Sequence, residues 1–149
     1  MRIEGKYLFY EWNDFEKDAN AIYKQYEKLS PHVIGIYRGS LPLAITLSNG
    51  FSNGMSVIRF QTRDGNDKTP KFIVDEIPEE GNILVVDDIY DTGHTMEKLR
   101  EFLIETISED RLHFVCLHEN EAVSKPESLN GIVQSYHTTQ GKWVVYPWE

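Results

Sequence analysis

The chain alternates short aliphatic runs with longer stretches that mix apolar and polar residues. The aliphatic runs, which are typical of strands buried on both faces, cover residues 32–37, 55–60, 82–88 and 112–118. The mixed stretches, which are expected to form helices, cover residues 12–29, 41–49 and 94–107. Strands that alternate with helices predict an α/β fold, with a mostly parallel twisted sheet flanked by helices.

Two of the expected helices have a defined apolar face. In residues 12–29 this face is formed by Phe15, Ala19, Tyr23 and Tyr26. Asn13 and Glu16 have the spacing of a capping box, which predicts a helix start at that point. In residues 94–107 the face is formed by Met96, Leu99, Leu103 and Ile107. Both helices are therefore expected to pack one side against the sheet.

Size and composition limit the classes of function. At 149 residues the chain is expected to form a single domain over residues 1–149. The net charge of −9 argues against nucleic acid as a partner, and no apolar run approaches the ~20 residues of a membrane span. The N-terminus lacks a signal-peptide pattern. The single cysteine, Cys116, lies in an aliphatic run, so we expect a buried core residue and a cytoplasmic protein.

The segment ILVVDDIYDTGHT, residues 83–95, leads from an aliphatic run into an expected helix. Gly93 permits a tight turn there, and the amides and dipole at a helix start favour an anion. Thr92 and Thr95 add hydroxyl donors, which suits a phosphate monoester. For DTGHT alone, helix capping explains the pattern equally well.

The adjacent carboxylates Asp87 and Asp88 favour a binding site over capping. Their negative charges repel one another at a strand end. A ligand that presents hydroxyl groups or a divalent cation would offset this repulsion. A ribose 5-phosphate offers a diol to the acids and a phosphate to the turn. A Walker B strand also ends in acids, but no GxxxxGK[ST] segment precedes this one, and a receiver-type pocket needs acids near the N-terminus.

Two further segments bear on the same site. Arg38, Gly39 and Ser40 follow the first aliphatic run, and ligands bind at the carboxyl ends of strands in such sheets. Residues 61–71 are entirely polar and predict a long loop, which is either a plain connector or a functional lid.

Three segments resemble the type I phosphoribosyltransferases. VVDDIYDTGHT is similar to their phosphoribosyl pyrophosphate signature, and GIYRGSLPLA resembles their pyrophosphate loop. The terminal WVVYPWE resembles the base-covering hood of the xanthine-guanine branch. The resemblance implies an enzyme of purine salvage, in which a purine base, expected to be guanine, xanthine or hypoxanthine, displaces pyrophosphate from C1 of the sugar. It also implies Mg²⁺ as cofactor, a homodimer or homotetramer, and a hood formed by about residues 119–149, with or without the N-terminus.

The resemblance also implies roles for single residues. Asp91 is expected to accept the proton lost by the base, with its pKa raised by burial beside other acids. Asp87 and Asp88 are expected to hold the ribose hydroxyls and Mg²⁺. The 5-phosphate is expected to be bound by Thr92, Gly93, His94 and Thr95. Pyrophosphate is expected to be bound by Arg38, Gly39, Ser40 and a lid residue, for which Arg63, Lys68 and Lys71 are the candidates. In the family this pyrophosphate loop often carries a non-proline cis peptide.

The base site departs from the family pattern at one position. Trp143 is expected to stack on the base and the Val144 backbone to contact its exocyclic group, while Trp148 packs inside. Asn120 stands where the purine branch usually has a lysine, and Lys125 substitutes for that lysine only if its loop folds back. A transferase for another base is therefore one alternative hypothesis. A non-catalytic sensor of phosphoribosyl pyrophosphate or nucleotides is the other.

Overall fold

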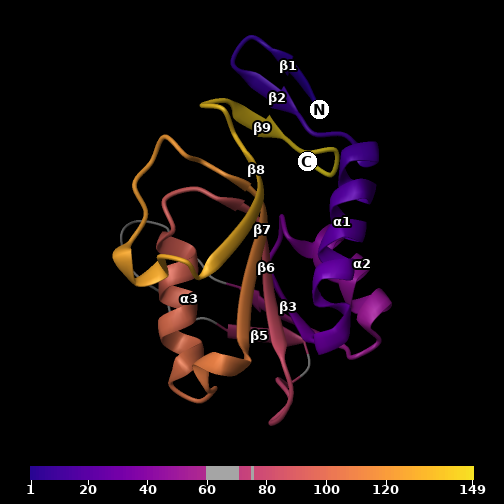
Figure 1. Ribbon diagram of the computed structural model, residues 1–149, viewed down its shortest axis with the longest axis vertical. Helices are drawn as coiled ribbons and strands as arrows, with labels where there is room; N and C mark the ends of the chain where they lie inside the picture. The colour runs from indigo at the N-terminus through magenta and orange to yellow at the C-terminus, as the bar shows by residue number, and fades with distance from the viewer. Residues whose placement is uncertain (60–70, 75) are drawn as a thin grey trace.

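The computed structural model describes residues 1–59, 71–74 and 76–149. Its centre is a six-stranded sheet in the order β5-β4-β3-β6-β7-β8 (Figure 1). The strands are β3 (His32–Ile36), β4 (Met55–Arg59), β5 (Lys71–Val74), β6 (Ile83–Tyr90), β7 (Leu112–Glu119) and β8 (Val133–Thr138). All run parallel except β5, which pairs antiparallel with β4 at one edge.

Helices cover both faces of this sheet, which confirms the predicted α/β fold (Figure 1). They are α1 (Trp12–Tyr26), α2 (Leu41–Phe51) and α3 (His94–Ile104). Helices α1 and α2 lie on one face, and α3 lies on the other. Short 3-10 helices at Glu27–Leu29, Glu109–Arg111 and Glu127–Leu129 lie in the connections.

Strand β6 separates two hydrophobic cores. Leu84 and Val86 belong to the core under α1 and α2, whereas Ile83 and Val85 belong to the core under α3. All four are completely buried, because successive side chains of a strand point to opposite faces and both faces are covered. Each contributes about 1.5–3 kcal/mol relative to an exposed position. This burial explains why the run is aliphatic throughout, and it leaves the carboxyl end of β6 between the two helical layers.

The predicted helix faces agree with the cores, with local corrections in α1. Met96, Leu99, Leu103 and Ile107 are all buried, as predicted, although α3 itself ends at Ile104. In α1 the fully buried residue is Ile22, while Tyr23 is half-buried and stacks on Phe51.

The predicted capping box of Asn13 and Glu16 is wrong. Helix α1 begins earlier, with Glu11 as its N-cap. The Asp14 carboxylate accepts hydrogen bonds from the Glu11 amide at 3.1 Å and from the N-terminal ammonium at 2.8 Å. A carboxylate at this position satisfies an amide of the first turn and opposes the positive end of the helix dipole.

A small three-stranded sheet lies at one end of the molecule and joins the two ends of the chain (Figure 1). Its strands are β1 (Arg2–Glu4), β2 (Tyr7–Phe9) and β9 (Trp143–Val145). Strand β2 pairs antiparallel with β1 and parallel with β9, and Leu8 and Val144 are buried beneath the sheet. The segment 119–149 thus contributes β8 to the central sheet and β9 to the small one.

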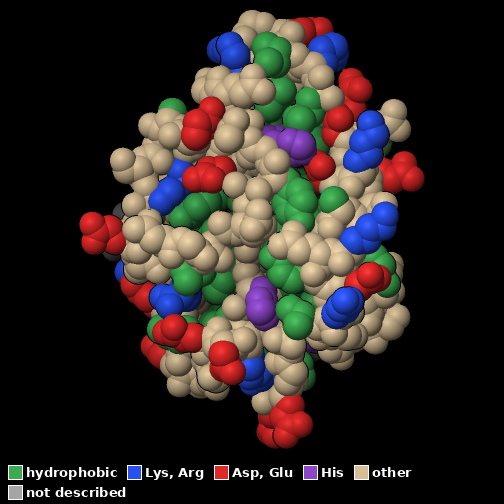
Figure 2. All heavy atoms as spheres, in the orientation of Figure 1, with side chains coloured by type: hydrophobic (Ala, Val, Ile, Leu, Met, Phe, Trp, Pro, Cys, Tyr) green, Lys and Arg blue, Asp and Glu red, His purple; other side chains and the backbone are tan. Residues whose placement is uncertain are grey.

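Several expectations concern composition and surface. Cys116 is completely buried, as predicted. Acidic and basic side chains are interspersed on the face shown in Figure 2, and the described Lys and Arg residues there do not gather into one patch. Within the described part of the chain, no helix has both the length and the apolar character required to cross a membrane. Lys71, expected in the polar loop 61–71, begins β5, while Arg63 and Lys68 lie outside the described residues.

Candidate active site

A cavity of about 210 Å³ opens at the carboxyl end of β6. Its lining residues come from the end of β6, the turn that follows, and the start of α3: Asp87, Ile89, Tyr90, Asp91, Thr92, Gly93, His94, Thr95 and Met96. The cavity therefore brings together the predicted phosphate turn and two of the three predicted acids. The third acid, Asp88, contacts the loop that follows β3.

The turn between β6 and α3 requires glycine at position 93. Gly93 has a φ of 84°, a conformation that side chains strongly disfavour. A Cβ atom there would also lie 2.8 Å from Cδ of Pro126 and 3.0 Å from Cε2 of Tyr90. The His94 amide donates to Oγ1 of Thr92 at 3.2 Å, and α3 begins at His94. The exposed turn thus sits on the N-terminal end of an 11-residue helix, where amides and dipole favour an anion.

The carboxylates of Asp87 and Asp88 are held close together. The Asp88 amide donates to Oδ1 of Asp87 at 3.0 Å, and the Ile89 amide donates to Oδ1 of Asp88 at 2.9 Å. Burial, followed by the neighbouring Asp88 charge, raises the pKa of Asp87 well above its ordinary value. Burial also raises the pKa of Asp88. No described Lys or Arg forms an ion pair with either acid, so within the described part of the chain neither carboxylate has a compensating cation.

The loop after β3 packs directly on Asp88. A Cβ atom on Gly39 would lie 2.3 Å from Oδ2 of Asp88, so only glycine fits this approach. The Tyr37–Arg38 peptide bond is cis, as the resemblance implied, and the Arg38 side chain is exposed. Ser40 is completely buried, and its hydroxyl donates to the Ile36 carbonyl, so that hydroxyl proton is already engaged inside the loop.

The resemblance implies phosphoribosyl pyrophosphate as the ligand, and we predict that Gly39→Ala weakens its binding by at least about tenfold. The added methyl group cannot occupy its position unless the Asp88 carboxylate or the loop moves, and small displacements in a packed site have large effects. Isothermal titration calorimetry would measure the affinity. Gly81→Ala is the control for steric contact, because nothing lies within 4 Å of its Cβ position, although Gly81, unlike Gly39, has a positive φ of 92°. An equal loss in both variants would contradict the steric explanation.

Asp91 is placed differently from our expectation. Its side chain is exposed, so the predicted burial beside other acids is wrong for this residue, whereas Asp87 and Asp88 are half-buried. Nδ2 of Asn120 donates to Oδ1 of Asp91 at 2.7 Å, which was not foreseen. The pairing arises because β6 and β7 are parallel neighbours, so the residues just beyond their ends lie side by side.

The loop after β7 does fold back. The Lys125 ammonium donates to the carbonyls of Asn120 at 2.6 Å and Val123 at 2.7 Å. It also lies 5.1 Å from the centre of the Tyr90 ring. These contacts keep the charge of Lys125 beside Asn120, within the loop that borders Asp91.

The two tryptophans of the C-terminal segment differ in their surroundings, and Trp148 packs against other side chains, as predicted. Its ring stacks on Tyr146 at 4.9 Å and packs edge-on against Phe15 at 5.5 Å. Trp143 lies on the small sheet with 69% of its surface exposed, whereas the Val144 side chain is buried and leaves only its backbone for a ligand.

The comparisons with known proteins agree with this geometry. The model of the phosphoribosyl transferase domain matches residues 9–148. The chain belongs to this family. A xanthine-guanine phosphoribosyltransferase from Cereibacter sphaeroides is 26% identical over 152 residues, covering 93% of this chain and 84% of the relative. The corresponding enzyme from Gluconobacter oxydans is 27% identical over 154 residues, covering 96% and 84%.

Solved structures show the same fold. A purine phosphoribosyltransferase from Pyrococcus horikoshii superposes with a TM-score of 0.78 at 24% identity, covering 97% of this chain and 95% of that one. A xanthine-guanine-hypoxanthine phosphoribosyltransferase from Helicobacter pylori superposes with a TM-score of 0.76 at 20% identity, covering 96% and 94%. The phosphoribosyltransferase family and fold predicted from the sequence are therefore confirmed.

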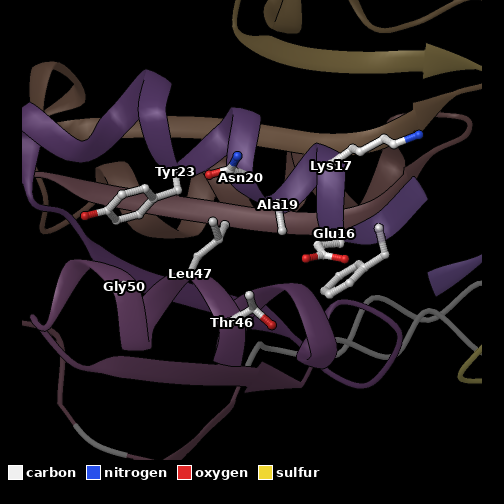
Figure 3. A pocket seen from close by; sticks show the side chains of 9 residues that line it. Glu16, Lys17, Ala19, Asn20, Tyr23, Thr46, Leu47 and Gly50 are labelled. Atoms are coloured by element: carbon white, nitrogen blue, oxygen red, sulfur yellow. The ribbon is translucent and has the colours of Figure 1, made fainter. Parts of the chain in front are cut away.

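This phosphoribosyl transferase domain has a second, larger hollow of about 760 Å³ between α1 and α2. Figure 3 shows Leu47 and Thr46 of α2 directed toward the side of α1 that carries Ala19 and Glu16. None of the predicted site residues lines this groove, and its walls are mostly apolar. The smaller cavity is therefore the candidate active site, because it contains the charged and hydroxyl groups that the chemistry requires.

Proposed function

We propose that the protein transfers the 5-phosphoribosyl group from phosphoribosyl pyrophosphate to a purine base, preferentially a 6-oxopurine, and releases pyrophosphate. The observation that carries this proposal is the junction of three elements at the end of β6. The phosphate turn begins α3, the two acids precede it, and Gly39 of the loop after β3 packs on Asp88. Two relatives that match this chain over most of their length are xanthine-guanine phosphoribosyltransferases, and their names support the choice of a 6-oxopurine as acceptor.

The turn and the acids divide the sugar phosphate between them. The amides at the start of α3, with Thr92, Gly93, His94 and Thr95, bind the 5-phosphate in this proposal. Asp87 and Asp88 accept hydrogen bonds from the ribose hydroxyls. Such hydrogen bonds to a charged acceptor contribute about 1.5–3 kcal/mol each, and they favour the ionised forms of two carboxyls whose pKa values burial has raised.

Mg²⁺ fits this site only together with the substrate. Among the described residues, no group of three or more His, Cys, Asp or Glu side chains is arranged to hold a metal. The pair Asp87 and Asp88 does provide carboxylate oxygens that no described Lys or Arg pairs with, and Mg²⁺ usually takes one or two carboxylates with substrate and water oxygens. When bound, the ion would neutralise negative charge on the pyrophosphate.

The remaining residues act at the reacting atoms. The bond between C1 of the ribose and the pyrophosphate oxygen breaks, and a bond between C1 and a nitrogen of the base forms. The exposed Arg38 and the backbone at Gly39 and Ser40 hold the leaving group and stabilise its developing charge. The proton lost by the base passes to Asp91, which borders the cavity.

The small sheet acts as the hood over the base in this proposal, formed by the C-terminal segment together with the N-terminus. Trp143 offers an exposed ring for stacking, and the backbone of Val144 contacts the exocyclic group. Asn120 lies beside Asp91 and next to the Lys125 ammonium, so this corner presents an amide where the family has a lysine.

We predict that Asn120→Ala lowers kcat by about 10–100-fold with little change in the KM for phosphoribosyl pyrophosphate. Removing the 2.7 Å hydrogen bond leaves the Asp91 carboxylate without its orienting donor. Asn120→Asp is the matched variant, because it retains the Oδ1 acceptor for the Ala122 amide but lacks the N–H that Asn120 donates to Asp91. Steady-state kinetics would compare them. Wild-type kcat in Asn120→Asp would show that this contact is dispensable.

A non-catalytic nucleotide sensor is the second candidate. One structure of this fold, a protein from Neisseria gonorrhoeae with bound ppGpp, has a TM-score of 0.70 at 20% identity and covers 99% of this chain and 92% of that one. Incubation with Mg²⁺, phosphoribosyl pyrophosphate and a panel of free bases separates the candidates. Nucleotide and pyrophosphate formed with guanine, xanthine or hypoxanthine support the transferase. Turnover with other bases alone would overturn the choice of acceptor, and tight ligand binding without any product would favour the sensor.

A further inference from the structure

The main chain of Asp88 is held by a buried side chain from the C-terminal segment. The Tyr146 hydroxyl donates to the Asp88 carbonyl at 2.9 Å and lies 3.0 Å from Nδ1 of His118 in β7. Tyr146 is 3% exposed and His118 is completely buried, so water does not compete for these bonds. The ladder between β3 and β6 ends at the Gly35–Val86 pair, and β6 continues past it beside β7 alone. The hydrogen bond from Tyr146 therefore holds the part of β6 that no longer pairs with β3.

The direction of the hydrogen bonds follows from the groups involved. A carbonyl can only accept, so the single proton of the Tyr146 hydroxyl points at Asp88 and its oxygen is left to accept from Nδ1–H of His118. Burial raises the pKa of Tyr146, which keeps this proton in place. Burial, followed by the charge of His137, lowers the pKa of His118 to about 4, so the ring is neutral near pH 7.

The other nitrogen of His118 supports the same tautomer. Nε2 is buried and has no hydrogen-bond partner among the described residues. With the proton on Nδ1, Nε2 carries only an unpaired acceptor. The opposite tautomer would bury an unpaired N–H donor and would also leave two acceptors, Nδ1 and the Asp88 carbonyl, competing for one hydroxyl proton.

We propose that His118 and Tyr146 are positioning residues, which orient the Asp88 backbone through a two-bond relay and couple the small sheet to the sugar-binding acids. The inference rests on the proposed function, because Asp88 is assigned there to the ribose. Tyr146 directly follows β9, the strand that carries Trp143, and Asp88 contacts Gly39 on its other side. A displacement of the small sheet is thereby transmitted to the carboxylate that faces the pyrophosphate loop.

Tyr146→Phe tests the relay, with Tyr10→Phe as its control. Both tyrosines are buried in the same cluster, but the Tyr10 hydroxyl donates to Asp18, away from the site. We expect Tyr146→Phe to raise the KM for phosphoribosyl pyrophosphate about tenfold, while Tyr10→Phe changes it less than about twofold. If KM changes equally in both variants and follows the decrease in melting temperature, the effect comes from general packing, and the relay is overturned.

His118 variants and hydrogen exchange complete the test. His118→Leu removes the donor and should resemble Tyr146→Phe, whereas His118→Asn places an amide N–H near the Nδ1 position and should recover most of the affinity. Amide hydrogen exchange of residues 87–90 in the ligand-free protein gives a readout independent of activity. Faster exchange in Tyr146→Phe alone supports the relay even if no base is accepted, and unchanged exchange overturns it even if the enzyme is active.

Discussion

Asp91→Ala is expected to lower kcat by about 10²–10⁴-fold, which is the usual contribution of a general base. The affinity for phosphoribosyl pyrophosphate should change less than about threefold, because Asp91 lies beyond the acids that we propose hold the ribose. Its carboxylate is exposed, borders the cavity and is oriented by Asn120. Single-turnover kinetics would measure the chemical step, and calorimetry would measure binding of the donor.

Two further variants make this result interpretable. Asp91→Asn retains the size of the side chain but cannot accept a proton, so it should be as slow as Asp91→Ala. Glu121→Ala removes an exposed acid of the same neighbourhood that accepts instead from Thr139, and it should retain wild-type kcat. If Asp91→Ala loses affinity and turnover to the same extent, the residue contributes to substrate binding and the proton acceptor lies elsewhere.

Asp87→Asn is expected to stabilise the ligand-free protein while weakening donor binding by about 10–100-fold. Burial and the adjacent Asp88 disfavour the ionised form of Asp87, and the amide removes that charge while its oxygen still accepts from the Asp88 amide. We expect the free energy of unfolding at pH 7 to rise, because the raised pKa of Asp87 means that ionisation destabilises the folded state. Thermal unfolding and calorimetry on the same samples would check both effects.

The pH dependence gives this stabilisation a distinct signature. Because the folded pKa of Asp87 is raised, the native state binds more protons than the unfolded state above the ordinary carboxyl pKa of about 3.9, and wild-type stability falls as pH rises. The advantage of Asp87→Asn should therefore vanish near pH 4 and grow toward neutral pH. A stability difference that is constant from pH 4 to pH 8 would show that ionisation of Asp87 does not destabilise the folded state.

The features predicted most accurately are those that local sequence determines. An aliphatic run such as ILVV that ends in acids and a glycine is typical of a buried strand followed by a turn, and Met96, Leu99 and Leu103 have the spacing that buries one side of α3. The start of α1 was misjudged because Asn13 has the commoner capping side chain. The structure instead has a capping box of Glu11 and Asp14, and Asp14 also accepts from the N-terminal ammonium, a contact that no spacing rule describes.

Contacts between distant segments were not predictable from spacing. The pairing of Asn120 with Asp91 depends on the parallel register of β6 and β7, and the Tyr146–Asp88 bond depends on where the chain returns after β9. Strand β5 was not predicted because its four residues, KFIV, adjoin an entirely polar stretch of the sequence and lie antiparallel at the edge of an otherwise parallel sheet. A tyrosine or an asparagine in a loop has many possible partners, and only the fold selects among them.

The parallel pairing of β2 with β9 also constrains the order of events during synthesis. Residues 7–9 leave the ribosome early, but their partners at 143–145 are made more than a hundred residues later, whereas the strands of the central sheet up to β7 are complete by Glu119. A nascent chain can therefore form the turn between β6 and α3 before β9, the pairing partner of β2, has been made. The small sheet can then form only after residues 143–145 have been made.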